Sequence, residues 1–461
     1  TGANNVAVGA YALDANTTAS NNTTVGSYSL TQNTTGASNV ALGVSALGYN
    51  TTASNNTAVG MDALKLNTTG ANNTAVGHNS LDANTEGGLN TAVGSASLGS
   101  NTTGVENTAV GVSSLTANTT ASYNTAMGRS ALTTNTTGAN NTAIGYDALN
   151  ANTTAGNNTA VGDGSLSTNT TGTSNVAVGL GALEANTTAN NNTAVGYLTM
   201  LANTTGHSNT AVGFEAGKAN TTGIRLTAFG YQAGKAHVAT GNVQNVFVGN
   251  EAGLGNTTGV TNTFIGGSAG AANTTGSQNI AVGTNSLGAN TTGTTNTALG
   301  TSSLQANTTA SNNTAVGHGA LAANTTGTRN NSLGNSSLVA NTTGDNNVAL
   351  GSQALQSNTT ADDNTAVGYA ALNLNTTGAE NTAVGKFALL SNTTASNNTA
   401  VGEGALQVTT TGQANTALGV DVLVANTTGL DNTAVGTSAL SANTTGSSNT
   451  IAGRAAGSSI T

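Results

Sequence analysis

The chain has 461 residues, only 5% of them charged, and its formal net charge is −9. An acidic chain with eight basic residues is not expected to bind nucleic acid, and no apolar run approaches the roughly 20 residues needed to insert across a membrane. Proline, cysteine and tryptophan are absent, so there is no disulfide frame, and the chain is compatible with an oxidising or a reducing compartment.

A 17-residue unit that begins Asn-Thr-Ala-Val-Gly repeats along the whole chain. Asn56–Gly60 is one copy; the phase holds from Asn5 to Leu226, shifts by two residues, and then runs from Asn245 to Asn449. A fixed period this short is typical of a solenoid, in which each unit is one coil stacked on its neighbours. The sequence therefore predicts an all-β fold, a parallel β-solenoid of about 27 coils, continuous over residues 1–461.

Each coil is expected to contain two short strands joined by turns. In the coil of residues 56–72, the runs 57–60 and 63–66 are of β type, and the Asn-Thr-Thr-Gly segment 67–70 turns the chain. Asn and Gly suit turns because they tolerate positive φ or bond to nearby backbone. With coils about 4.8 Å apart, the stack would be a rod on the order of 130 Å long.

One asparagine of each unit is expected to form a ladder inside the stack. Every position meets its own copy above and below, so Asn67 should lie between Asn50 and Asn84. A ladder of side-chain amides of this kind satisfies the buried turns at each level. Between Asn16 and Asn443, only His237 and Thr409 replace asparagine at this position.

Strand alternation predicts which side chains share a face. Thr57 and Val59 share one face, and several units place Val or Ile at the Thr57 position, which favours this face as the interior, opposite Leu64. Ala58 and Gly60 would then form an outward strip without bulky side chains, a feature that usually marks the close approach of another backbone. Because a single thin roll is poorly filled, the sequence predicts packing against copies of itself, as a homotrimer.

The repeat resembles a known family. Asn5–Gly9 (Asn-Val-Ala-Val-Gly) and Asn141–Gly145 (Asn-Thr-Ala-Ile-Gly) are similar to the Asn-Ser-Val-Ala-Ile-Gly repeat of trimeric autotransporter adhesin heads. The whole unit, with its Asn-Thr-Thr-Gly turn, also resembles repeat arrays of bacterial surface proteins and phage tail fibres. The resemblance implies a left-handed parallel β-roll with three chains side by side, at a cell or virion surface. It implies no binding residue, and the adhesin unit is shorter than 17 residues.

Residues 209–278 form a variant subregion that includes one 19-residue coil, 226–244. Phe229 takes the usual Val position, Phe247 and Phe264 take the Ala position, and glycines replace the usual Leu: Gly217, Gly234, Gly253 and Gly270. The simplest interpretation is an exchange of volume between the two walls. The subregion is either a binding bulge or a bend or splice between two arrays.

No arrangement of residues predicts catalysis, a cofactor or a metal. The segments 213–218 and 230–235 are one residue short of a phosphate loop and lack its Ser or Thr, and their glycines belong to the repeat. The four histidines lie coils apart and are expected to be exposed: His78, His207, His237 and His318. Asp362 and Asp363 are interpreted as a solvated edge. The protein is therefore not expected to be an enzyme.

Two further signals depend on asparagine and threonine. The segments 67–69 and 55–57 match the Asn-x-Thr acceptor pattern for glycosylation, but turn stacking explains both residue types without a glycan. Ice binding would use flat arrays of threonine, usually Thr-x-Thr on one strand, whereas here the strand is Thr-Ala-Val and Thr68 and Thr69 lie in a turn with diverging side chains.

The sequence thus predicts a structural extracellular fibre shaft of the adhesin or tail-fibre type, at a cell or virion surface. It would supply reach and surface display or attachment, with a surface glycan or host receptor as an external partner. The alternatives are an ice- or glycan-binding solenoid with a repeated Thr/Asn face, and a subunit that joins end to end into filaments. We interpret the chain as a segment of a longer or processed protein.

Overall fold

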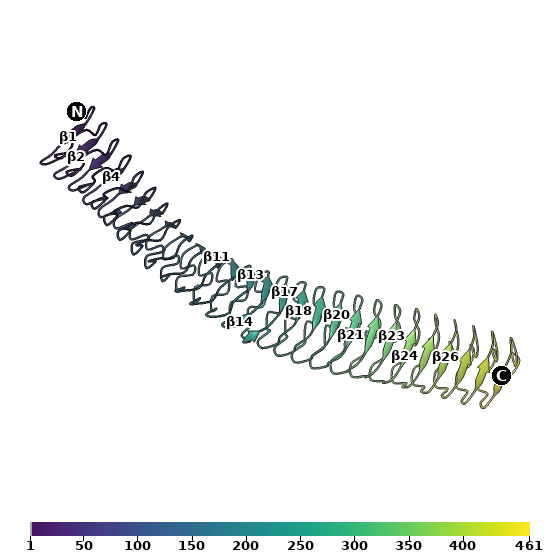
Figure 1. The fold of residues 1–461 in the computed structure, drawn as a ribbon. Helices are drawn as coiled ribbons and strands as arrows, with labels where there is room; N and C mark the ends of the chain where they lie inside the picture. Colours follow the sequence, from purple (N-terminus) through teal and green to yellow (C-terminus); the bar gives the residue numbers. More distant parts are fainter. Residues whose placement is uncertain (1) are drawn as a thin grey trace. The chain divides into compact units, whose positions relative to one another are not determined.

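The computed structural model describes residues 2–461 (Figure 1). The chain is a parallel β-solenoid of about 27 coils, and all its regular elements in the described residues are strands. It divides into two compact units, one up to Leu226 and one formed by Thr227–Thr461. The described residues form no helix that could span a bilayer.

The first unit contains 13 three-residue strands and one short strand. They are β1 (Val6–Val8), β2 (Thr23–Val25), β3 (Val40–Leu42), β4 (Thr57–Val59), β5 (Thr74–Val76), β6 (Thr91–Val93), β7 (Thr108–Val110), β8 (Thr125–Met127), β9 (Thr142–Ile144), β10 (Thr159–Val161), β11 (Val176–Val178), β12 (Thr193–Val195), β13 (Thr210–Val212) and the two-residue β14 (Gly223–Ile224). Successive three-residue strands pair in parallel with no change of register, as β4 and β5 do.

The second unit repeats this arrangement. Its strands are β15 (Thr227–Phe229), the two-residue β16 (Gly241–Asn242), β17 (Val246–Val248), β18 (Thr263–Ile265), β19 (Ile280–Val282), β20 (Thr297–Leu299), β21 (Thr314–Val316), β22 (Asn331–Leu333), β23 (Val348–Leu350), β24 (Thr365–Val367), β25 (Thr382–Val384), β26 (Thr399–Val401), β27 (Thr416–Leu418), β28 (Thr433–Val435) and β29 (Thr450–Ala452). In the standard coils the constant register follows from the constant unit length, because 17 residues return the chain to the same point of the coil. The 19-residue step from β15 to β17 keeps the same register, with Thr227 paired to Val246.

The predicted second strand of each coil is absent from a standard coil such as residues 56–72. There the segment after β4 is a series of turns, in which Asp62 and Leu64 have φ angles of 58° and 51°. Alternating left-handed residues bend the chain tightly instead of extending it. This segment is still bonded from coil to coil: the Leu64 N–H donates to the Ser80 carbonyl (2.9 Å) and the Leu66 N–H to the Asp82 carbonyl (3.0 Å).

The prediction that Thr57 and Val59 face the interior is wrong. Ala58 is fully buried, whereas its two strand neighbours are half-exposed. A Cβ added to Gly60 would lie 2.5 Å from the Gly77 carbonyl oxygen, and the φ of Gly60 is 134°. Small residues here do mark a close backbone approach, but the backbone is that of the next coil of the same chain. The Ala/Gly strip is therefore not available for a second copy.

The predicted asparagine ladder is confirmed. Asn67 Nδ2 donates to Asn50 Oδ1 (2.9 Å), and Asn84 Nδ2 donates in turn to Asn67 Oδ1 (2.8 Å). The same amide of Asn67 also closes its own turn, at 2.9 Å from the Gly70 carbonyl. All three asparagines are fully buried, so each polar atom of the ladder needs its neighbour as a partner.

A second asparagine ladder begins each strand. The Asn73 backbone N–H donates to Asn56 Oδ1 (2.9 Å), and Asn73 Nδ2 donates to the Gly87 carbonyl (2.9 Å). This ladder ties the start of the strand to the turn at the end of the same coil, whose Gly87 carbonyl also accepts from Asn84 Nδ2 (2.9 Å). In each unit the interior thus contains buried Ala and Leu side chains together with two rows of buried amides that meet at the Asn-Thr-Thr-Gly turn.

The predicted exchange of volume in residues 209–278 is confirmed in the second unit. Phe247 and Phe264 are fully buried and stack with ring centroids 5.5 Å apart. A Cβ at Gly253 would lie 2.6 Å from the Phe247 ring, and one at Gly270 would lie 2.5 Å from the Phe264 ring. An inward Phe therefore occupies the space that Leu fills in a standard coil. Phe229 differs, because it stands at an outward strand position and is exposed.

Candidate functional site

Each coil presents several outer surfaces of different composition. The first, called the strand face, is formed by the first and third residues of each three-residue strand, such as Thr57 and Val59. The second, called the turn face, is formed by the outward residues between the strand glycine and the ladder asparagine, which in the same coil are Met61, Asp62, Lys65 and Leu66. A third consists of the exposed residues after the ladder asparagine, such as Thr69 and Asn72. A functional site on these units must use an outer surface, because the interior is closed by side chains.

The strand face carries no formal charge, and the column formed by its third residues is apolar throughout. The third residue of every three-residue strand is Val, Leu, Ile, Met, Phe or Ala. Many of these side chains are exposed, among them Val8 at 56% and Leu333 at 50%. None of the eight basic and 17 acidic residues of the chain lies in a strand. An uncharged row of exposed apolar side chains of this length suggests a contact surface.

The turn face carries most of the charges and exposed aromatic rings. Tyr11 and Tyr28 stack in neighbouring coils with centroids 5.1 Å apart, and Tyr197 and Phe214 do the same at 5.2 Å. All four rings are exposed. The residues of this face vary from coil to coil while the strand and the ladders stay nearly constant, so the turn face can distinguish one coil from another.

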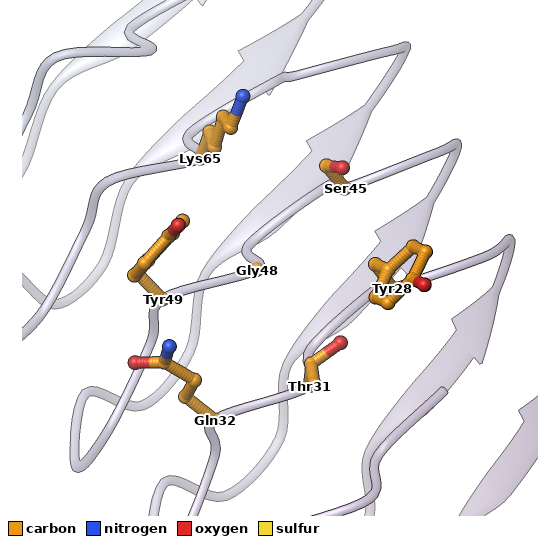
Figure 2. A pocket seen from close by; sticks show the side chains of 7 residues that line it. All are labelled: Tyr28, Thr31, Gln32, Ser45, Gly48, Tyr49 and Lys65. Carbon is orange, nitrogen blue, oxygen red and sulfur yellow. The ribbon is translucent and has the colours of Figure 1, made fainter. Parts of the chain in front are cut away.

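A hollow of about 280 Å³ opens on the turn face of the first unit (Figure 2). Its floor is Gly48, and the side chains around it come from three successive coils: Tyr28, Gln32, Ser45, Tyr49 and Lys65, with Thr31 beside them. Gly48 stands where the neighbouring coils carry Thr31 and Lys65. The hollow therefore exists because this one coil lacks a side chain at a position that its neighbours fill.

The charged groups beside this hollow are paired. Lys65 Nζ lies 3.1 Å from Asp62 Oδ1, with both side chains partly exposed. Burial raises the pKa of the Asp82 carboxyl one coil further on, while its own N–H and that of Ala83 lower it, and the Asp62 carboxylate adds a smaller upward contribution. The hollow thus offers an ammonium group whose charge is largely balanced.

Most residues singled out in the sequence are dispersed. His78, His207 and His318 are exposed as predicted, and Asp362 and Asp363 are exposed on the edge of their coils. Within residues 2–461, no group of three or more acidic or histidine side chains could hold a metal ion.

The ladder asparagines of the Asn-Thr-Thr turns, such as Asn67, are fully buried and inaccessible to a glycan. Asn55, in contrast, is exposed. Of the paired turn threonines, Thr68 is half-buried and its hydroxyl donates to the Thr85 carbonyl (2.9 Å), while Thr69 is exposed. The two side chains therefore diverge, as expected.

His237 does not follow the prediction of an exposed histidine. It is fully buried at the ladder position, where its Nδ1 lies 3.0 Å from Asn256 Nδ2 and its Nε2 has no partner. Burial lowers the pKa of its imidazole to about 4, so the ring is neutral at physiological pH. His237 lies 17 residues after the ladder residue Asn220. Its position in the repeat therefore indicates burial, whereas its residue type alone suggested exposure.

The hollow around Gly48 was not found from the sequence. Gly48 lacks the side chain that Thr31 and Lys65 supply at the same position of the neighbouring coils. The sequence does not show, however, that this position lies on the outer surface, because that depends on the geometry of the turns. No known protein-family model matches the chain, and no curated protein matches it.

Proposed function

We propose that the chain is a structural fibre shaft, located outside the cell on a cell or virion surface, that supplies reach and display or attachment. The observation that carries the proposal is the bonding along each stack, where strand, turn and two amide ladders all join one coil to the next. The stability of such a structure is approximately the sum of the stabilities of its coils and of the interfaces between neighbouring coils, so the rod can be lengthened by adding coils. Within residues 2–461, no group of acidic or histidine side chains that could hold a metal ion competes with a mechanical function.

We further propose that copies associate laterally through the strand face, as a homotrimer. A second copy suits this face because it presents apolar side chains at the same spacing from coil to coil. Thirteen strands of the first unit, at about 3.3 Å per residue and about 4.8 Å per strand, form a face of about 600 Å². Two such faces in contact would bury about 1,200 Å², within the range of specific interfaces.

Native mass measured by light scattering tests the association. A mass of three chains of 44.3 kDa each is expected, and Val76→Lys with Val110→Lys, two coils apart on the strand face, should reduce it to one chain. Leu89→Lys is the matched control, since Leu89 is exposed outside this face and Arg225 and Arg329 occupy its position in other coils. A single-chain mass for the unaltered protein refutes lateral association, whereas a mass that grows with concentration supports end-to-end filaments instead.

A second candidate is an array that binds ice or glycan, supported by one row of threonines. Thr69 and most of its equivalents are exposed, and no hydrogen bond occupies the Thr69 hydroxyl in the described residues. Only one threonine per turn points outward, however, and Glu86 interrupts the row. Inhibition of ice recrystallisation that weakens steadily as coils are removed would favour this candidate, because a shaft should be inert in that assay.

A further inference from the structure

The hollow around Gly48 combines features that a generic gap between coils lacks. A second hollow, of about 220 Å³, opens on the turn face of the second unit beside Gly288 and has the same origin, a small residue in the turn column. It is lined by Ser268, Ala271, Asn285, Ala289 and Gln305 and contains no ring. Small residues alone therefore produce hollows, and the tyrosines are what distinguish the hollow at Gly48.

Tyr28 is held in place as a platform. Its ring stacks on Tyr11 of the preceding coil with an interplanar angle of 15°, while Ser45 of the following coil lies on the side of the hollow. Half of the Tyr28 surface stays exposed. A ring fixed by a neighbour loses little freedom when a ligand stacks on its other side, which favours binding.

The polar groups surround this platform in a pattern typical of sugar recognition. Tyr49 supplies a second exposed ring on the opposite side of Gly48, and Gln32 supplies an amide that both donates and accepts (Figure 2). Lys65 adds donors with a balanced charge because Asp62 pairs with it. The volume lies near the lower end of small-molecule pockets, about 300 Å³, which suits one ring of a longer chain.

We propose that this hollow binds a neutral pyranose saccharide, with a sugar ring stacked on Tyr28 or Tyr49 and its hydroxyls bonded to Gln32 and Lys65. An apolar ligand fits poorly because amide, hydroxyl and ammonium groups lie beside the rings. A strongly anionic ligand gains little because Asp62 offsets the charge of Lys65. The inference rests on the proposed role in surface attachment and names the chemical class that the first unit would recognise.

Substitutions that other coils already accept test the site without disturbing the fold. Leu66 occupies the position of Tyr49 one coil later, and Thr31 occupies that of Gly48 one coil earlier. Tyr49→Leu thus removes a ring, and Gly48→Thr fills the floor, where a Cβ would lie 3.2 Å from the Ser45 carbonyl oxygen. Tyr123→Leu is the control, because Tyr123 is exposed away from the hollow and Leu89 occupies its position elsewhere.

The probes are maltopentaose, cellopentaose and mannopentaose, titrated calorimetrically into the intact chain. At least one should bind saturably, and Tyr49→Leu and Gly48→Thr should each weaken that binding about tenfold, while Tyr123→Leu leaves it unchanged. The inference is overturned if none of the three binds below about 10 mM, or if Tyr49→Leu and Tyr123→Leu behave alike. Light scattering of the same samples reports self-association separately, so loss of the saccharide site and failure of the shaft proposal are distinguishable.

Discussion

The gap at Thr409 in the asparagine ladder gives a direct test of what that ladder contributes to stability. Asn392 Oδ1 is buried without a partner because the next coil offers threonine. Asn426 Nδ2 reaches only the Gly429 carbonyl, at 3.2 Å. Thr409 Oγ1 donates instead to the Asn426 carbonyl (3.1 Å). Thr409→Asn should restore the continuous row of amides.

The expected gain follows from counting these bonds. Satisfying the unpaired Asn392 oxygen is worth about 1–3 kcal/mol, a new bond from Asn426 Nδ2 about 1 kcal/mol, and the lost Thr409 hydroxyl bond costs about 1 kcal/mol. The net stabilisation is about 1–3 kcal/mol. Steric strain should be small, because the neighbouring ladder positions hold asparagine with the same local geometry.

Hydrogen exchange is the best assay, because unfolding of a solenoid is governed by neighbouring coils and a global midpoint dilutes a local change. The turn amides between Asn392 and Asn426 should exchange about tenfold or more slowly in Thr409→Asn. Thr428→Asn, at an exposed position two residues after a ladder asparagine, is the control. The reasoning is refuted if both variants exchange at the rate of the unaltered protein, because the buried oxygen of Asn392 would then carry no penalty.

Three further outcomes are expected. Asn341→Ala should lower stability in urea by about 2–4 kcal/mol because it removes ladder bonds on both sides, while Thr343→Ala, at an exposed position two residues later, should stay within about 0.5 kcal/mol. Gly270→Leu should be strongly destabilising alone yet tolerated with Phe264→Ala, which restores the standard pair; a double-mutant cycle with coupling below about 0.5 kcal/mol would contradict the volume exchange. Because burial lowers the pKa of His237 to about 4, the unfolded chain binds the proton first, and stability should fall as pH drops from about 6.5 towards 4. Urea unfolding should show a loss of about 2 kcal/mol between pH 7 and pH 5 that His237→Asn abolishes; an equal loss in that variant would assign it to other groups.

The sequence by itself determined the repeat, the solenoid and the ladder of Asn67. A constant period places each residue beside its own copy, so identities seventeen residues apart are contacts. The same logic identified the exchange between Phe264 and Gly270, because volume on one wall must be matched by space on the other.

Only the tertiary structure decided which side of the strand is inside. Strand alternation shows that Thr57 and Val59 point to the same side of the strand, but not whether that side is the interior. A position that accepts Thr or Val is compatible with a half-exposed surface as well as with an interior. The direction is set by the left-handed backbone at Leu64, which bends the chain so that Ala58 and the leucine meet. Leucine rarely adopts that conformation, so its residue type gives no signal of it. For the same reason the hollow at Gly48 emerged only once the turn residues had been placed on the outer surface.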